Sequence, residues 1–114
     1  MKDERLYLIH IVECVTRIQQ YTSEGKEVFM NDTKTQDAVL RNLQTLAEST
    51  QCISANLKVA HPEVEWSKIA GLRNILVHDY LGINLVRIWE ILRHGLPELK
   101  NQVTSILDAL GNPC

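Results

Sequence analysis

Hydrophobic residues recur at steps of three and four along most of the chain, which is the spacing of amphipathic helices. The first predicted helix shows this spacing in Leu8, Ile11, Val15 and Ile18, which fall on one face. Gly25 follows this pattern, and we expect it to end or bend the helix.

A long second helix is expected to begin at Asn31-Asp32-Thr33, whose side chains can accept hydrogen bonds from a helix start, and to end near Pro62. Its face alternates steps of four and three, close to a heptad, which suits packing beside other helices at a shallow angle. Thr50 and Gln51 interrupt the apolar pattern of this face. The face comprises Val39, Leu43, Leu46, Thr50, Ile53 and Leu57.

Three shorter helices complete the predicted fold. One runs from about Glu65 to His78, and Gly82 breaks the chain after it. The last two are separated by His94-Gly95-Leu96-Pro97, because Gly ends helices readily and Pro starts them. Their apolar positions are Leu85, Ile88, Trp89 and Leu92, and then Leu99, Val103, Ile106 and Leu110. No segment alternates like a strand, so residues 1–114 are predicted to form one all-α domain, an up-and-down bundle of about five helices.

The composition is that of a small globular domain. Of the 114 residues, 45% are hydrophobic and 23% charged, which argues against disorder. A core of this size is modest, so apolar surface is expected to be buried against a second copy. The net charge of −2 excludes a broad basic surface, and any nucleic-acid site must therefore be a local positive cleft.

Several classes of site and location are disfavoured. The three cysteines, Cys14, Cys52 and Cys114, are odd in number and far apart, so reduced thiols and a cytoplasmic protein are expected. No signal peptide or membrane-spanning run is visible. No phosphate-binding glycine loop, zinc spacing or paired-aspartate motif occurs, so we expect no cofactor and no metal, and the chain is not itself a nucleotidyltransferase.

The third predicted helix gathers the candidate chemistry. On a helical wheel, its apolar residues Ile69, Leu72, Ile75 and Leu76 face the core. Its polar residues Arg73, Asn74, His78 and Tyr80 fall within an opposing arc of roughly 160°. Ala70 and Val77 lie inside this polar arc, which suggests a surface that a partner covers. Geometry alone also fits a structural interpretation, with Arg73 paired to a carboxylate, His78 capping the helix and Tyr80 packed.

A family resemblance favours the chemical interpretation. Arg73, four residues, His78, one residue and Tyr80 resemble the Arg-x4-His-x-Tyr motif of HepT toxins in the HEPN superfamily, and Asn74 matches the polar residue that follows the arginine. The stretch from Asp37 to Leu43 resembles the second-helix signature of that family. Trp66 and Trp89 stand where the family has tryptophan. The similarity covers about residues 37–99.

The resemblance implies a HEPN fold, a homodimer and a ribonuclease toxin of a type VII toxin–antitoxin system. Arg73, Asn74 and His78 would be catalytic, with supporting phosphate contacts from Lys68 or Arg41. Metal-free RNA cleavage needs a base, an acid and a cation, and two facing motifs would supply two histidines.

The resemblance also implies a partner. An MntA-like nucleotidyltransferase antitoxin would add AMP to Tyr80. RNA is the expected substrate, with no membrane or DNA partner.

Two other functions remain open. The first is a non-catalytic HEPN module that binds nucleotide or a nucleotidyltransferase partner, and the second is a structural helical adaptor. The other histidines are interpreted as outside the site: His94 beside a helix end, where a cation suits the dipole, and His10 and His61 without an evident partner.

Overall fold

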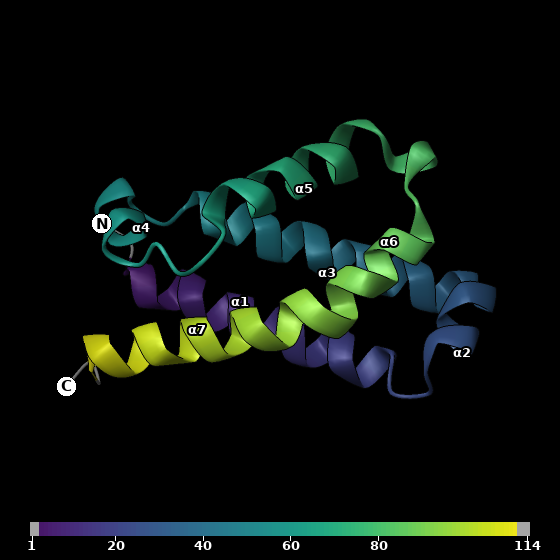
Figure 1. Cartoon of the computed structure of the whole chain (residues 1–114), viewed down its shortest axis with the longest axis horizontal. Helices are drawn as coiled ribbons and strands as arrows, with labels where there is room; N and C mark the ends of the chain where they lie inside the picture. Colours follow the sequence, from purple (N-terminus) through teal and green to yellow (C-terminus); the bar gives the residue numbers. More distant parts are fainter. Residues whose placement is uncertain (1–2, 112–114) are drawn as a thin grey trace.

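The computed structural model describes residues 3–111, and helices make up almost all of this range (Figure 1). No strand occurs in the described part, which confirms the predicted all-α class. Nor is any helix there long and apolar enough to cross a membrane. The helices are α1 (Glu4–Tyr21), α2 (Lys26–Asn31), α3 (Thr33–Gln51), α4 (Ala55–Ala60), α5 (Trp66–His78), the 3-10 helix η1 (Tyr80–Gly82), α6 (Leu85–Glu90), the π-helix η2 (Ile91–Gly95) and α7 (Leu96–Leu110).

Short polar residues begin several of these helices, as the sequence predicts. Asp3 accepts a hydrogen bond from the backbone N–H of Arg5 at the start of α1. Asp32 does the same for Lys34 at the start of α3, which confirms the expected helix start. Between these two helices the chain reverses through Gly25, whose φ of +101° lies in a region that side chains disfavour.

The core lies between α1, α3 and α7, which run side by side along the length of the molecule (Figure 1). Leu8, Leu43 and Val103 represent the three helices in this core, and each is fully buried. Phe29 of α2 stacks against Trp89 of α6 with ring centroids 5.5 Å apart, which holds the far end of the bundle together. By contrast, α5 packs mainly on α3.

The predicted long second helix is wrong in its second half. Helix α3 ends at Gln51, and α4 begins after Ser54, whose hydroxyl accepts a hydrogen bond from the Leu57 N–H. The backbone N–H of Ser54 donates to the Glu4 carboxylate of α1 instead of to a carbonyl one turn back. This alternative acceptor, together with the Ser54 cap, ends the helix.

The predicted interruption at residues 94–97 is also wrong, because α6 continues into α7 through a π-turn. The Leu96 N–H donates to the carbonyl of Ile91, five residues back. Pro97 follows, in the first turn of α7. In a regular α-helix its ring would collide with the carbonyl of Arg93, and the wider turn accommodates it without a break.

Candidate functional site

Helix α5 carries the motif, and a hydrogen bond from a tryptophan side chain holds its start. The indole N–H of Trp66 donates to the His61 carbonyl at 2.9 Å, which ties the helix to the preceding loop. The predicted span of about Glu65 to His78 agrees with the observed helix. Its expected core face is only partly correct. Leu76 is buried, but Ile75 is 49% exposed because α3 covers a single side of α5.

Arg73 is the most constrained residue of the motif. Its side chain is half-buried, and its Nε is fully covered and has no hydrogen-bond acceptor. One terminal nitrogen, Nη1, donates to the Asn74 Oδ1 at 3.4 Å. No carboxylate in residues 3–111 pairs with Arg73, so the ion pair of the structural interpretation is not observed. The guanidinium therefore keeps its positive charge without a neutralising partner in the described residues.

His78 completes the described part of the motif on the last turn of α5. It is exposed, as is Asn74 one turn before it, so both side chains are available to a ligand. Within the described range, no hydrogen bond or ion pair engages the His78 ring. The structure therefore places Arg73, Asn74 and His78 along one helix, with the arginine anchored and the other two open to solvent.

Tyr80 lies in the tight 3-10 turn that follows α5, but its side chain lies outside the described parts of the structure. In this turn the Asp79 side chain lies close to Gly82, a contact that the sequence pattern does not predict. A Cβ at Gly82 would lie 2.7 Å from Oδ1 of Asp79, so the carboxylate occupies the space above the glycine. The Gly82 N–H also donates to the Asp79 carbonyl at 3.0 Å. A larger residue at position 82 would therefore displace the exposed Asp79 carboxylate, whereas the φ of Gly82 places no demand on the residue.

The two cations expected to support phosphate binding lie outside the Arg73–Asn74–His78 group, and their contact with RNA stays a prediction. Lys68 pairs with Glu65 at 2.7 Å on the first turn of α5. Arg41 is exposed on α3. Neither makes a hydrogen bond to Arg73 or His78 within residues 3–111.

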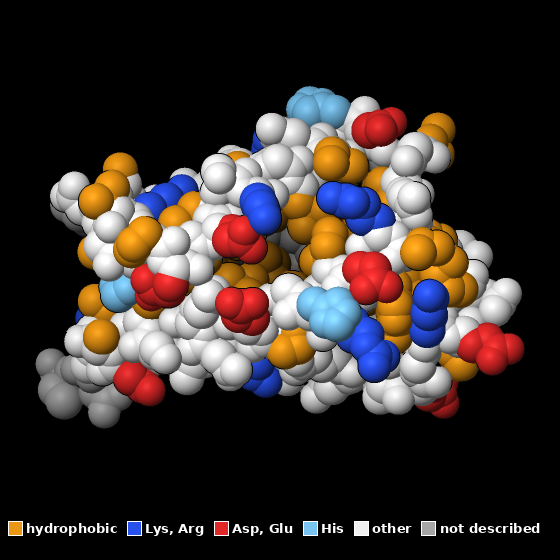
Figure 2. All heavy atoms as spheres, viewed as in Figure 1, with side chains coloured by type: hydrophobic (Ala, Val, Ile, Leu, Met, Phe, Trp, Pro, Cys, Tyr) orange, Lys and Arg blue, Asp and Glu red, His pale blue; other side chains and the backbone are white. Residues whose placement is uncertain are grey.

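An uncovered apolar surface adjoins the motif. Ile75 and Val77 of α5 are 49% and 39% exposed, and Leu81 in the following turn is completely exposed. Val77 therefore lies open among the polar motif residues, as expected from the helical wheel. Figure 2 shows hydrophobic side chains at the bottom of a hollow between α5 and the α6–α7 arm, with charged side chains around its rim.

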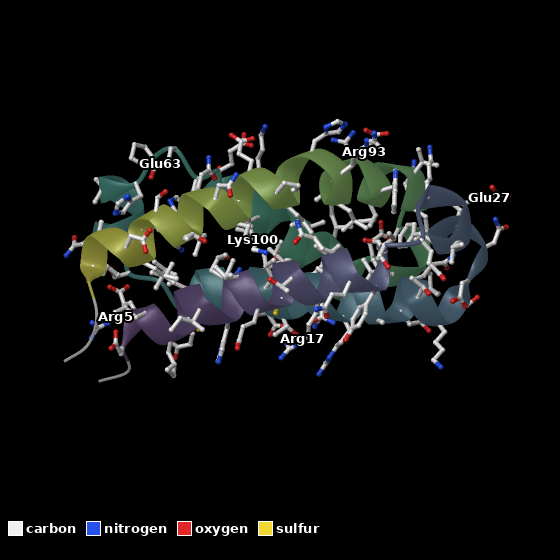
Figure 3. All side chains as sticks on the ribbon, turned by 90° about the horizontal axis from the view of Figure 1, so that it is seen from below. Arg5, Arg17, Glu27, Glu63, Arg93 and Lys100 are labelled. Atoms are coloured by element: carbon white, nitrogen blue, oxygen red, sulfur yellow. The ribbon has the colours of Figure 1, made fainter. Side chains whose placement is uncertain are left out.

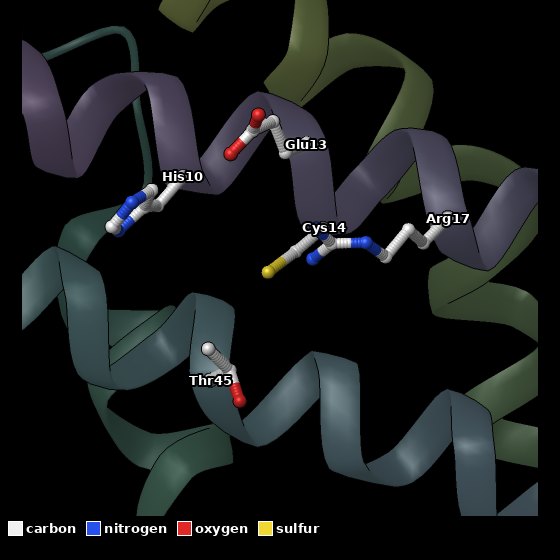
Figure 4. A pocket seen from close by; sticks show the side chains of 5 residues that line it. All are labelled: His10, Glu13, Cys14, Arg17 and Thr45. Carbon is white, nitrogen blue, oxygen red and sulfur yellow. The ribbon is translucent and has the colours of Figure 1, made fainter.

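A separate pocket, lined by polar residues, lies between α1 and α3, away from the motif (Figure 4). It has a volume of about 190 Å³ and is lined by His10, Glu13, Cys14, Arg17 and Thr45. Burial raises the pKa of the Cys14 thiol, and the nearby Arg17 offsets this only in part. The thiol therefore stays protonated and is a poor nucleophile. No group of three or more His, Cys, Asp or Glu in the described residues is placed to hold a metal ion.

Two of the three other histidines engage carboxylates away from the motif, and His10 is exposed on α1. The His61 Nδ1 lies 3.2 Å from the Glu63 carboxylate, and the His94 Nε2 lies 3.4 Å from that of Glu90. The prediction that His61 has no partner is therefore wrong, because the Glu63 carboxylate, two residues away, contacts its ring.

Comparison with known proteins decides the family. Residues 11–106 match the family described as Ribonuclease HepT-like. The chain belongs to the HepT-like ribonuclease family. Among its relatives, "Putative RNase TTE0752" of Caldanaerobacter subterraneus subsp. tengcongensis is 36% identical over 94% of this chain and 96% of that protein. The "mRNA nuclease HepT" of Shewanella oneidensis is 29% identical over 84% of this chain and 90% of its own length.

One relative is longer than this chain. The "Gamma-glutamylcyclotransferase and putative RNase MJ0434" of Methanocaldococcus jannaschii is 30% identical over 96% of this chain, which spans about half, 50%, of that protein. No solved structure matches the chain significantly.

Proposed function

We propose that this HepT-like chain is a metal-independent endoribonuclease and the toxin of a type VII toxin–antitoxin pair. The observation that carries this proposal is that Arg73 has no carboxylate partner among the described residues, while Asn74 and His78 stand exposed on the same helix. A phosphate would bind the terminal nitrogens of Arg73, because a guanidinium forks onto phosphate. Membership of the ribonuclease family makes RNA the source of the phosphate.

The reaction uses the 2′-hydroxyl of RNA as its nucleophile. His78 of one copy takes the 2′ proton, the 2′ oxygen bonds to phosphorus, and the bond from phosphorus to the 5′ oxygen breaks. His78 of a second copy protonates the leaving 5′ oxygen. The products are a 2′,3′-cyclic phosphate and a 5′-hydroxyl. Arg73 stabilises the charge on phosphorus, and Asn74 holds the guanidinium or a phosphate oxygen.

The second histidine requires a homodimer. One chain carries a single motif histidine, so an acid and a base together need two motifs facing across a two-fold axis. The exposed apolar residues Ile75, Val77 and Leu81 support this arrangement, because they adjoin the motif and leave hydrophobic surface in water. Two copies of Arg73 would also create a local positive cleft on a chain of net charge −2.

Neutralisation would act through Tyr80. An MntA-like nucleotidyltransferase would transfer AMP from ATP to this tyrosine, with release of pyrophosphate. Tyr80 follows α5 directly, in the turn next to His78. Each AMP adds a negatively charged phosphodiester close to the motif, where it would compete with RNA for Arg73.

The test is cleavage of RNA by the purified chain in EDTA. We expect cyclic-phosphate ends, no cleavage where the 2′-hydroxyl next to the cut is replaced by hydrogen, and loss of at least about 100-fold in kcat for His78→Ala, a typical general acid–base contribution. His10→Ala is the matched control, since His10 is exposed on α1 and remote in sequence from the motif.

Three outcomes would contradict the proposal. They are loss of activity in EDTA, equal cleavage by His78→Ala, and absence of cleavage by a folded dimer. The last result would favour a binding module without catalysis.

A further inference from the structure

The arm opposite α5 carries a strip of basic side chains that the motif does not include. It consists of Arg87 on α6 and of Arg93 and His94 on the π-helix, and all three are exposed. Neither Arg87 nor Arg93 makes a side-chain hydrogen bond or ion pair with any described residue. We refer to these three residues as the basic strip.

A single carboxylate accompanies the basic strip. Glu90 is three residues from both Arg87 and Arg93 and four from His94, so all three are its neighbours on the helix surface. Glu90 lies 3.4 Å from His94, which leaves both arginines uncompensated. A positive surface therefore persists here on a chain whose net charge is −2.

The position of the strip relates it to the motif. The ribbon of α6 and the segment after it lies across from that of α5 (Figure 1), and Figure 2 shows a hollow between them. Figure 2 shows Lys and Arg side chains on both sides of this hollow. Arg73 belongs to α5, and it too lacks a carboxylate partner in the described part of the chain. The C-terminal arginines Arg73, Arg87 and Arg93 are thus all free to bind anions.

An RNA strand is a ligand that could contact Arg73 and the basic strip together. It carries one phosphate per nucleotide, so a strand whose scissile phosphate lies at Arg73 presents further phosphates to the surface around the site. Arginine binds such phosphates through two parallel hydrogen bonds, and every bound phosphate adds salt-sensitive affinity.

We propose that Arg87, Arg93 and His94 bind the RNA phosphates that flank the scissile one. The inference rests on the proposed ribonuclease function and extends it to the length of RNA that is recognised. Because these contacts lie away from the reacting bonds, they hold the substrate and the transition state equally. They therefore lower KM for long RNA without raising kcat.

The experiment compares two substrates, a single-stranded RNA of about 20 nucleotides and a dinucleotide whose only phosphate is the scissile one. We expect the double variant Arg87→Gln/Arg93→Gln to raise KM for the long RNA about tenfold. The preference of kcat/KM for long RNA over the dinucleotide falls by the same factor. In a His78→Ala background, the dependence of log affinity on log salt should lose about 0.7 per phosphate contact removed.

The single variant Arg93→Gln is measured as well, and Arg17→Gln is its control. Figure 3 shows Arg17 and Arg93 on opposite sides of the molecule, and both are exposed. This change removes the same charge and should leave the substrate preference and the salt slope unaltered. Glutamine keeps the helical propensity, so the melting temperature of each variant should stay close to that of the wild type.

Each alternative result overturns the inference. If the wild type is active and the double variant keeps the same preference for long RNA, the basic strip does not bind RNA, but the ribonuclease proposal still stands. An equal loss on both substrates, or the same effect from Arg17→Gln, shows a structural or general charge effect. Weakened binding of an acidic protein partner with unaltered RNA binding assigns the strip to that partner. Absence of RNA cleavage by the wild type defeats both proposals.

Discussion

Arg73 donates a hydrogen bond from Nη1 to the Oδ1 of Asn74 at 3.4 Å, while its covered Nε has no acceptor. The amide thus contacts one terminal nitrogen of the guanidinium and leaves its positive charge in place. This pairing of adjacent residues explains why a polar side chain directly after the arginine is useful. An amide restricts the arginine side chain but leaves its charge, whereas a carboxylate would neutralise that charge.

Asn74 is therefore predicted to affect catalysis through Arg73. Asn74→Ala should lower kcat for RNA cleavage about tenfold, which corresponds to about 1.4 kcal/mol of transition-state stabilisation. Asn74→Asp should be worse, because a carboxylate beside Arg73 competes with phosphate. Single-turnover cleavage measures both effects. Asn101→Ala, at an exposed position on α7, is the control. A kcat for Asn74→Ala equal to that of Asn101→Ala would show that the amide has no role.

Val77 is predicted to lie in the dimer interface, since it is 39% exposed among the motif residues. Val77→Arg would place a charge in that interface, and two copies would repel across the two-fold axis. Sedimentation at micromolar concentration should show a monomer with native helix content and no RNA cleavage. Val59→Arg, at a 79% exposed position on α4, should remain an active dimer. An active Val77→Arg monomer would refute the composite site.

The turn that carries Tyr80 is predicted to depend on the contact between Gly82 and Asp79. Gly82→Ala puts a Cβ 2.7 Å from the Asp79 Oδ1, so the exposed carboxylate must rotate away, and the free energy of unfolding should fall by no more than about 0.5 kcal/mol. Asp79→Ala removes the obstacle, so the double variant should recover most of this loss. Urea denaturation of the four proteins gives the coupling energy. Additive effects would mean that the two side chains do not meet in solution.

How far the sequence predicts this molecule depends on the range of the interactions involved. Periodicity located α1 and α5 well, because a helix face repeats locally. The end of α3 was missed because it depends on Glu4, fifty residues away, which takes the Ser54 N–H. The continuous passage from α6 into α7 was missed because Gly95 and Pro97 are local signals for a break, and a π-turn absorbs them.

The candidate site divides in the same way. Spacing along α5 placed Arg73, Asn74 and His78 on one surface, and the structure agrees. The exposure of Ile75 could not be predicted, since it depends on how α5 leans on α3. Nor could the covered Nε of Arg73, which depends on packing around that side chain.

Cys14 is predicted to react slowly with alkylating reagents in the native protein. Burial raises the pKa of its thiol, so less of the reactive thiolate forms at a given pH. The native state then binds this proton more tightly than the unfolded chain. Protonated Cys14 therefore contributes to the free energy of unfolding in full below the pKa that its thiol has in the unfolded chain. This contribution is lost as the pH rises toward the higher pKa of the thiol in the native protein. Peptide mapping after alkylation at rising pH should show Cys52, which is exposed, labelled before Cys14. Equal rates for Cys14 in native and urea-unfolded protein would contradict this.

Tyr80 is predicted to be the residue that the antitoxin modifies. Its turn follows the motif helix, so a nucleotide added there is attached two residues after His78. A tyrosine hydroxyl is neutral at physiological pH, so the transferase must supply the base and metal ions that activate it. After incubation with the nucleotidyltransferase partner and ATP, intact-mass measurement should show one or more added AMP units and a matching loss of RNA cleavage. Tyr80→Phe should show neither change while still cleaving RNA, and Tyr21→Phe, at a 42% exposed tyrosine on α1, should behave as the wild type. Addition of AMP that persists in Tyr80→Phe would place the modification elsewhere, and modified protein that still cleaves RNA would separate it from neutralisation.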